Sequence, residues 1–206
     1  MEWVCAWLVC VMKLISWNVQ GLGGIDKRRE VRRLVGEKSP SILCLQETKL
    51  SVCDDFLCNS LWGDSNHSFS YHPSVGASGG LLIMWATKEV EVWSSGSQEH
   101  VLYIQGRFIR TNEEFYLFNI YAPCELHAKQ ALWGSLSTRL QLLSGANVCL
   151  CGDINSVRDV EERWSKRGNN VVYDFNNFSH FIDANGLIDL PLCGRRYTWF
   201  KGVVQL

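Results

Sequence analysis

An aspartate and an asparagine follow an apolar segment within Asn147–Val157, and their types and spacing could carry chemistry. Val148 and Leu150 alternate with cysteines ahead of Asp153 and Asn155, which predicts a strand ending in a carboxylate and a carboxamide. In α/β sheets, ligands bind at the carboxyl ends of strands. Residues two apart on an extended backbone share a face, so the sequence predicts a base or metal ligand beside a hydrogen-bonding group. Alone, the pattern fits an ordinary turn after a strand better than a catalytic site.

Polar residues also end three other predicted strands. They are Asn18, Glu47 and Tyr121, at the ends of strands predicted over residues 13–19, 41–46 and 114–121. If these ends converge with Asp153 at one rim, two carboxylates, two amides and a phenol share a pocket. Oxygen-rich sites with few carboxylates suit Mg²⁺, and phosphate-ester hydrolysis is a chemistry that such sites serve. The alternatives are turn and surface roles for Asn18 and Glu47, and a strand aromatic with a solvated hydroxyl for Tyr121.

Other segments provide the elements that must position these residues. A helix capped by Asp26 is predicted to end at Ser39, and a second helix at 51–61 is predicted to turn Phe56 inward. Residues 63–74 are polar and rich in turn formers, and the strands that follow without helices predict antiparallel pairing. The later predictions are amphipathic helices at 125–144 and at 174–184, the second capped by Asp174 and ended by Gly186, and short strands at 187–190 and 196–200.

Length and composition indicate one globular domain. The chain has 206 residues, of which 47% are hydrophobic, enough for a single sizeable core. The net charge of −1 gives no global basic field, so any nucleic-acid contact must be local. The one dense basic run, within residues 27–33, fits a solvated helix face. The nine cysteines are odd in number and lack metal-site spacing, which favours reduced thiols and an intracellular location.

The first eleven residues are apolar but lack the basic start of a signal peptide. They run directly into the predicted strand at 13–19 and are too short for a transmembrane span, as is every other apolar segment. We therefore expect no membrane partner. Residues 1–11 are predicted to be a non-native extension, and the domain is predicted to occupy residues 12–206.

Five ordered motifs give the chain a specific resemblance. SWNVQG, CLQET, SGGLLIMW, NIYAP and CGDIN resemble the endonuclease/exonuclease/phosphatase superfamily, the fold of apurinic endonucleases and DNase I, over about residues 13–201. The later run with GLIDLPL is similar, more narrowly, to the endonuclease domain of plant LINE-type retrotransposons. The resemblance implies an α/β sandwich in which two packed mixed β-sheets are flanked by helices, in four layers.

The resemblance also implies a role for each candidate residue. Glu47 would be the principal ligand of Mg²⁺, with Mn²⁺ as the alternative metal, and Asn18 would help to hold the metal. Asp153 would orient and deprotonate the attacking water. Asn155 would fix Asp153 and touch the phosphate, and Tyr121 would hydrogen-bond a phosphate oxygen. The metal would stabilise charge that develops on the phosphate.

The chain departs from the family pattern in two places. Cys124 stands where family members have an asparagine after Tyr-x-Pro. After Trp199, the chain supplies neither the family's Asp-Arg strand nor its Ser-Asp-His strand, and none of the five histidines lies in a matching context. The sequence therefore predicts a fold without its last strands, poorly stable and weak or inactive.

Three functions remain open at this point. The first is a Mg²⁺-dependent DNA endonuclease of a LINE-like element, which would work in the nucleus. The second is a phosphatase of the same fold that acts on a small phosphorylated molecule. The third is a non-catalytic remnant that binds DNA weakly, in a salt-dependent way, or not at all.

Overall fold

The computed structural model describes residues 3–7, 12–76, 78–158 and 175–190 of the chain. The elements in these ranges are, in order, β1 (Trp3–Trp7), β2 (Met12–Asn18), α1 (Ile25–Lys38), β3 (Ile42–Gln46), α2 (Asp55–Trp62), β4 (His67–Val75), β5 (Ser78–Ala86), β6 (Val90–Gln98), β7 (Val101–Phe108), β8 (Glu114–Tyr121), α3 (Leu126–Leu142), β9 (Val148–Asp153) and α4 (Phe175–Ala184). The predicted strand at 196–200 and the predicted cap Asp174 lie outside the described residues.

The strands form two sheets, each from one continuous part of the chain. The first has the order β1-β2-β3-β5-β4, and the second has the order β6-β7-β8-β9. β4 with β5, β6 with β7 and β7 with β8 pair antiparallel, as predicted for strands without intervening helices, but β5 and β6 lie in different sheets and do not pair; β2 with β3 and β8 with β9 are parallel. The connections within these parallel pairs contain α1 and α3, respectively, because a parallel pair needs a long crossover.

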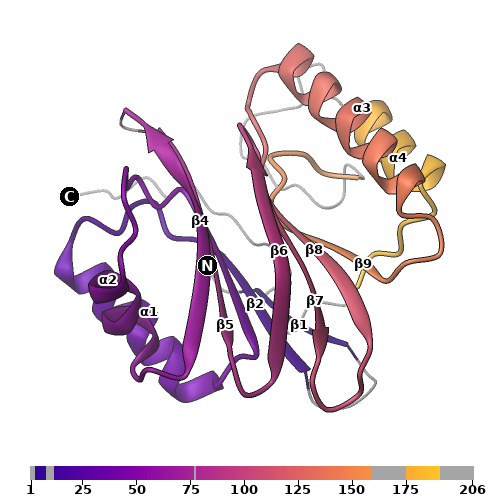
Figure 1. Ribbon diagram of the computed structural model, residues 1–206. Coiled ribbons are helices and arrows are strands. Elements are labelled where there is room, and N and C mark those ends of the chain that lie inside the picture. Colours follow the sequence, from indigo (N-terminus) through magenta and orange to yellow (C-terminus); the bar gives the residue numbers. More distant parts are fainter. Residues whose placement is uncertain (1–2, 8–11, 77, 159–174, 191–206) are drawn as a thin grey trace.

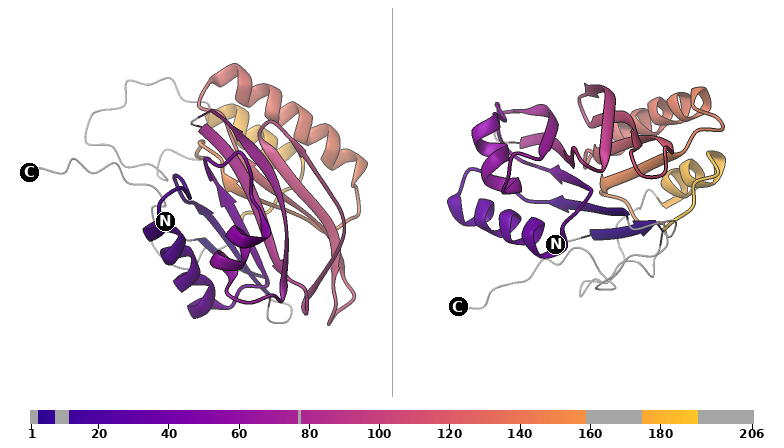
Figure 2. Two further views of the ribbon diagram at one scale, coloured as in Figure 1. Left: turned by 60° about the vertical axis from the view of Figure 1, so that its left-hand side comes forward. Right: turned by 60° about the horizontal axis from the view of Figure 1, so that its bottom comes forward.

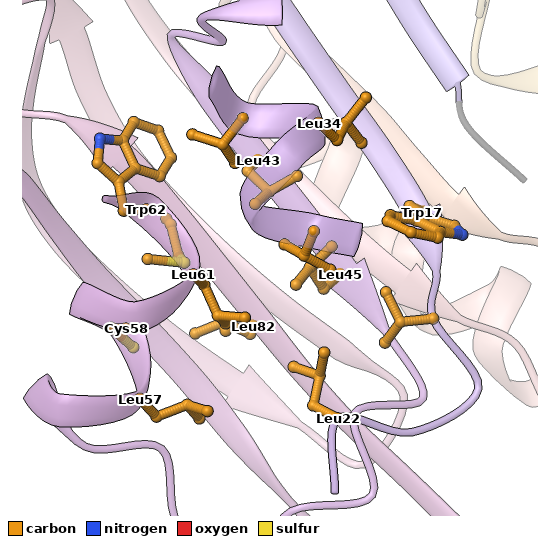
Figure 3. Close-up of a cluster of buried hydrophobic side chains, with 14 of the residues drawn as sticks. Trp17, Leu22, Leu34, Leu43, Leu45, Leu57, Cys58, Leu61, Trp62 and Leu82 are labelled. Atoms are coloured by element: carbon orange, nitrogen blue, oxygen red, sulfur yellow. The ribbon is translucent and has the colours of Figure 1, made fainter. Parts of the chain in front are cut away.

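The two sheets pack face to face, and helices cover both outer faces, so the molecule has four layers (Figure 1). α1 and α2 cover the first sheet over the apolar cluster drawn in Figure 3, which includes Trp17, Leu45 and Leu61. α3 and α4 cover the second sheet, as the views of Figure 2 also show. This arrangement confirms the predicted fold class of two mixed sheets flanked by helices.

Strand β3 shows why the centre of the first sheet is apolar without a break. All five of its residues are buried. Leu43 and Leu45 face the helices, whereas Ile42 and Cys44 face the second sheet. A strand covered on both faces needs an apolar residue at nearly every position, so no alternation appears in its sequence. The run ends at Gln46, directly before Glu47.

The helix starts differ from the predictions in two places. The N-cap of α1 is Gly24 instead of Asp26, which lies in the first turn, where a carboxylate favours the helix dipole. α2 starts at Asp55, and the side chain of its N-cap, Asp54, accepts a hydrogen bond from the Leu57 amide. With this start, Phe56 is 79% exposed, so the prediction that it faces inward is wrong.

Two strand predictions also need correction. The structure has the edge strand β4 where turns are predicted at 63–74. Phe69, Tyr71 and Val75 alternate there with polar residues, and Phe69 and Tyr71 pack against the core, so a strand pattern was present among the turn-forming serines. Residues 187–190 are not a strand. The Leu187 amide instead donates to the Ile182 carbonyl beyond Gly186, whose φ of 59° closes α4 as predicted.

The first sheet extends to β1, which pairs antiparallel with β2. The prediction that residues 1–11 are a non-native extension stays a prediction. Among the described residues, no helix is long and apolar enough to cross a membrane.

Candidate active site

The carboxyl ends of the two parallel strand pairs meet between the sheets. Asn18 of β2 lies opposite Gln46 of β3 in the first pair, and Tyr121 of β8 lies opposite Asp153 of β9 in the second. The Asn18 amide nitrogen donates to Asp153 Oδ2 over 2.6 Å, across 135 residues of sequence. The structure therefore brings the predicted strand ends together, one pair from each sheet.

The Tyr121 hydroxyl connects the two predicted carboxylates. Burial, the negative charges of Glu47 and Asp153 and a hydrogen bond to Glu47 together raise its pKa to about 12, with burial the largest cause. A phenol beside a carboxylate donates its proton, so Tyr121 is the donor in this bond. Tyr121 is therefore neutral at physiological pH, and Glu47 and Asp153 both lie near its hydroxyl.

Glu47 lies in a tight turn that follows β3. Glu47 and Lys49 both have φ of 56°, a left-handed conformation that costs about 1 kcal/mol for residues with a Cβ. The Thr48 and Lys49 amides donate to the carbonyls of Gly80 and Gly79 over 3.1 and 3.0 Å, which holds the turn against β5. The Glu47 side chain is only 18% exposed, and its Oε1 lies 3.0 Å from Lys49 Nζ.

Both oxygens of the Asp153 carboxylate accept hydrogen bonds. Oδ2 accepts from Asn18, and Oδ1 accepts from the Asn155 backbone amide over 3.3 Å. One of these donors belongs to the first sheet and the other to the turn after β9. Because the two donors lie on different elements, they fix the rotation of the carboxylate as well as its position.

Asn155 does not share an extended backbone with Asp153, so that part of the prediction is wrong. β9 ends at Asp153, and Asn155 has φ of 50°. Its side-chain amide turns to the Ala122 carbonyl after β8 and donates to it over 2.7 Å. Asn155 therefore contacts Asp153 through its backbone, and the predicted contact of its side chain with a phosphate stays a prediction.

The Asn18 side chain has two partners. Its Oδ1 accepts from the Gln20 amide over 3.1 Å, while its nitrogen donates to Asp153. The geometry therefore shows Asn18 holding Asp153. Its predicted part in holding a metal stays a prediction that depends on the second lone pair of Oδ1.

Sequence reasoning missed two lysines at the site. Lys49 neutralises Glu47, and its position two residues after that glutamate was a visible signal. Lys129 is buried on α3, and its ammonium donates to the Asn155 carbonyl. Lys129 could have been noticed because it lies at helical spacing from Trp133 and Leu136, on the apolar face of the helix.

A buried amide pair lies behind the pocket and was also missed. Gln46 and Asn119, 1% and 0% exposed, hydrogen-bond across the two sheets over 2.6 Å. Gln46 also donates to Ser16 Oγ over 3.0 Å, and Asn119 donates to the Leu45 and Leu82 carbonyls. Gln46 precedes Glu47, and Asn119 lies two residues before Tyr121, so this pair connects the backbones that carry the site.

The donor set fits a metal that retains water. Among the described residues, no three His, Cys, Asp or Glu side chains form a closed metal cage. Glu47 and Asp153 both lie near the neutral Tyr121 phenol. Mg²⁺ is commonly bound through one or two carboxylates and keeps several waters, whereas structural zinc needs four closely placed ligands. These residues therefore suit Mg²⁺ or Mn²⁺ better than zinc.

Known proteins share this sequence pattern and this fold. The chain is 28% identical to an exodeoxyribonuclease of Bacillus subtilis over 92% of its own length and 80% of that protein. Its structure is similar to an AP endonuclease from Leishmania major, with a TM-score of 0.68 and 20% identity, over 84% of this chain and 66% of that one. It is also similar to D. rerio TDP2 in complex with a single-strand DNA product, with a TM-score of 0.54 and 20% identity over 87% of this chain and 66% of that one.

A family model gives the assignment. The model described as the Endonuclease/Exonuclease/phosphatase family matches residues 15–202, which include every predicted site residue. The two solved structures share the fold at 20% identity, and the family match extends over nearly the whole chain. The chain belongs to the endonuclease/exonuclease/phosphatase family.

Proposed function

We propose that the chain is a metal-dependent phosphodiesterase domain that acts on DNA, with Mg²⁺ as the metal and Mn²⁺ as the alternative. The observation that carries this proposal is the shared pocket of Glu47, Tyr121 and Asp153, in which Asn18 bridges the sheets to Asp153. Two carboxylates and a neutral donor in one half-buried pocket suit the attack of water on a phosphate ester.

Each residue has a proposed part in the reaction. Glu47 would hold the metal with help from Asn18, and the bound metal would neutralise charge on the phosphate oxygens. Asp153 would accept the proton of the attacking water as its oxygen bonds to phosphorus and the ester oxygen leaves. Tyr121 would donate a hydrogen bond to a phosphate oxygen, for which its raised pKa keeps it protonated.

DNA is the proposed substrate because similar proteins carry nuclease names. They are the exodeoxyribonuclease of Bacillus subtilis and the AP endonuclease of Leishmania major. We further propose that the domain derives from a LINE-like element, on the evidence of the GLIDLPL run at 186–192. Such an origin requires that a nick leave a 3′-hydroxyl that a polymerase can extend.

Nicking of supercoiled plasmid by the full 206-residue chain tests this proposal. We expect slow nicking that needs Mg²⁺ or Mn²⁺, stops with EDTA and falls at least about 100-fold in Asp153→Ala and Glu47→Gln. Lys88→Met, which removes an exposed lysine beyond β5, is the matched control and should nick at the wild-type rate. Nicking that survives Asp153→Ala would contradict the proposal.

A phosphatase is the second candidate, because the fold also resembles a mannosyl-6-phosphatase from Bacteroides thetaiotaomicron with a TM-score of 0.54. Release of phosphate from nucleotides or sugar phosphates, faster than plasmid nicking, would favour it. Salt-dependent DNA binding without cleavage of either substrate would instead support a non-catalytic domain.

A further inference from the structure

Lys129 occupies a position on α3 where the fold calls for an apolar residue. It lies on the buried face of the helix with Leu132, Trp133 and Leu136, and it is 8% exposed. Lysine is almost never buried unless it is paired, because desolvating an ammonium is unfavourable. None of the ion pairs between described residues involves Lys129. Its burial therefore needs another explanation.

The ammonium of Lys129 donates to the backbone carbonyl of Asn155. Asn155 has φ of 50°, and its side chain donates to the Ala122 carbonyl over 2.7 Å. The residue is thus held on two sides, by α3 and by the segment after β8. A left-handed asparagine is tolerated, but it persists where its surroundings select that conformation.

The conformation of Asn155 sets the direction of its backbone amide, which donates to Asp153 Oδ1 over 3.3 Å. Two hydrogen bonds therefore connect Lys129 to Asp153 through the backbone of Asn155. Packing of the aliphatic stem does not explain why a lysine stands at this buried position, because methionine would fill similar space without burying an ammonium. What only the lysine supplies is a donor to the carbonyl.

We infer that Lys129 is a positioning residue, which fixes the turn at Asn155 and through it the carboxylate of Asp153. The consequence for turnover rests on the proposed function, in which Asp153 accepts the proton of water. The effect of Lys129 on the conformation of the turn at Asn155 does not depend on the proposed function. Loss of the donor leaves the turn at Asn155 held on one side only, by its bond to the Ala122 carbonyl, which weakens the backbone contact of Asn155 with Asp153.

Three variants of the full chain separate the donor from the packing. Lys129→Met removes the donor and keeps the stem, Lys129→Arg restores a donor, and Lys88→Met is a control at an exposed lysine. The first readout is hydrogen exchange of the Asn155 amide by NMR, with the Phe118 amide in the core of β8 as the internal reference. The second is plasmid nicking, resolved into kcat and KM.

In Lys129→Met we expect the Asn155 amide to exchange about tenfold faster relative to Phe118, as for loss of one charged hydrogen bond. Lys129→Arg should recover most of this protection. In nicking, kcat should fall about tenfold in Lys129→Met, with KM within about twofold, because the lysine acts through a group of the enzyme.

Unchanged relative exchange of Asn155 in Lys129→Met would overturn the inference. So would an equal rise in exchange at Phe118, which would mean general destabilisation. If the wild-type chain does not nick DNA, the proposed function fails, while the exchange measurement still decides the role of Lys129.

Discussion

The Tyr121 hydroxyl lies between two carboxylates, and this neighbourhood determines its charge. Burial, Glu47 and Asp153 all favour the neutral phenol, so its pKa is about 12 in place of the ordinary 10. A neutral phenol can donate to a phosphate oxygen, whereas a phenolate would repel it. The residue thus remains a hydrogen-bond donor throughout the pH range in which DNA is stable.

The raised pKa of Tyr121 predicts an alkaline loss of stability. Below about pH 10 both the folded and the unfolded chains hold the phenol proton, so the stabilisation that comes from the raised pKa of Tyr121 is fully present. Between about pH 10 and 12 the unfolded chain releases a proton that the folded chain keeps, so stability falls. In Tyr121→Phe, the free energy of unfolding should fall less steeply across this range. Urea unfolding at several pH values measures the difference, and parallel curves would contradict it.

Strand-end reasoning predicted four residues of the site and not the contacts that hold them. Asn18, Glu47, Tyr121 and Asp153 could be predicted as candidates because each ends a largely apolar strand or directly follows one. The bond from Lys129 to Asn155 depends on how α3 packs, which no local pattern encodes. The left-handed turn at Glu47 likewise follows from the approach of Gly79 and Gly80 on another strand.

At the scale of elements, the basic face of α1 is more than a solvated surface. Arg32 donates to the carbonyls of Asn59 and Gly63 over 3.3 and 3.1 Å, at the C-terminal end of α2. Arg33, by contrast, pairs with Glu37 one turn later on the same helix. One arginine of the run therefore joins two helices, and its neighbour matches the predicted solvated face.

This contrast predicts different effects for two similar substitutions. Arg32→Met should lower the free energy of unfolding by about 1 kcal/mol, since the last carbonyls of α2 lose a charged donor. Arg33→Met should change it by less than about 0.5 kcal/mol, because exposed i,i+4 pairs contribute little. Urea denaturation of both variants is the measurement. Equal effects would show that Arg32 does not stabilise the end of α2.

Strand β9 depends on a glycine that touches its neighbour. Gly152 has φ of 135°, and a Cβ there would overlap the Ile120 carbonyl and lie 2.7 Å from the Ile120 amide nitrogen. Gly145, before the strand, also has positive φ, at 85°, but nothing within 4 Å of a Cβ. Comparing alanine substitutions at Gly152 and Gly145 therefore distinguishes the effect of steric overlap from the effect of backbone strain.

Gly152→Ala should destabilise the protein by about 3 kcal/mol or more, because β8 and β9 must move apart. Gly145→Ala should cost only about 1 kcal/mol, the price of the backbone conformation alone. Thermal unfolding of both variants tests the difference. If the two midpoints shift equally, close approach of β8 is not what requires glycine.

At the scale of the whole molecule, the two sheets are joined by amides as well as by apolar packing. Gln46 and Asn119 hydrogen-bond to each other in the core between the sheets. A buried polar group that loses its partner is unfavourable, whereas removing both amides leaves neither of the two facing an apolar side chain, although Ser16 and the Leu45 and Leu82 carbonyls still lose a donor. The pair thus specifies one alignment of the sheets.

The effects of the two single substitutions on the free energy of unfolding should therefore not sum to the effect of the double substitution. Asn119→Leu or Gln46→Leu alone should lower the free energy of unfolding by about 2 to 4 kcal/mol. The double variant should cost less than the sum of the two singles by at least about 1 kcal/mol. Chemical denaturation of all four proteins gives the coupling. Simple additivity would mean that the two amides act independently.

The predicted fold class depended on motif order, and the structure explains why composition alone was not enough. The central strand β3 is apolar up to Gln46 and would suit several architectures, while the edge strand β4 alternates only weakly, with serines and histidines between its few apolar residues. The division of strands between two sheets depends on pairings such as β3 with β5, which follow from the folded arrangement and not from neighbouring residues.

Each sheet comes from one uninterrupted stretch, with β1 to β5 ending at Ala86 and β6 starting at Val90. A break in the intervening turn would leave Glu47 on one fragment and Asp153 on the other. Neither fragment alone would hold both carboxylates, and only reassociation would rebuild the pocket. For dilute, separately purified halves, the proposed nicking would then rise with the product of the two fragment concentrations, so its rate would measure reassociation of the two sheets.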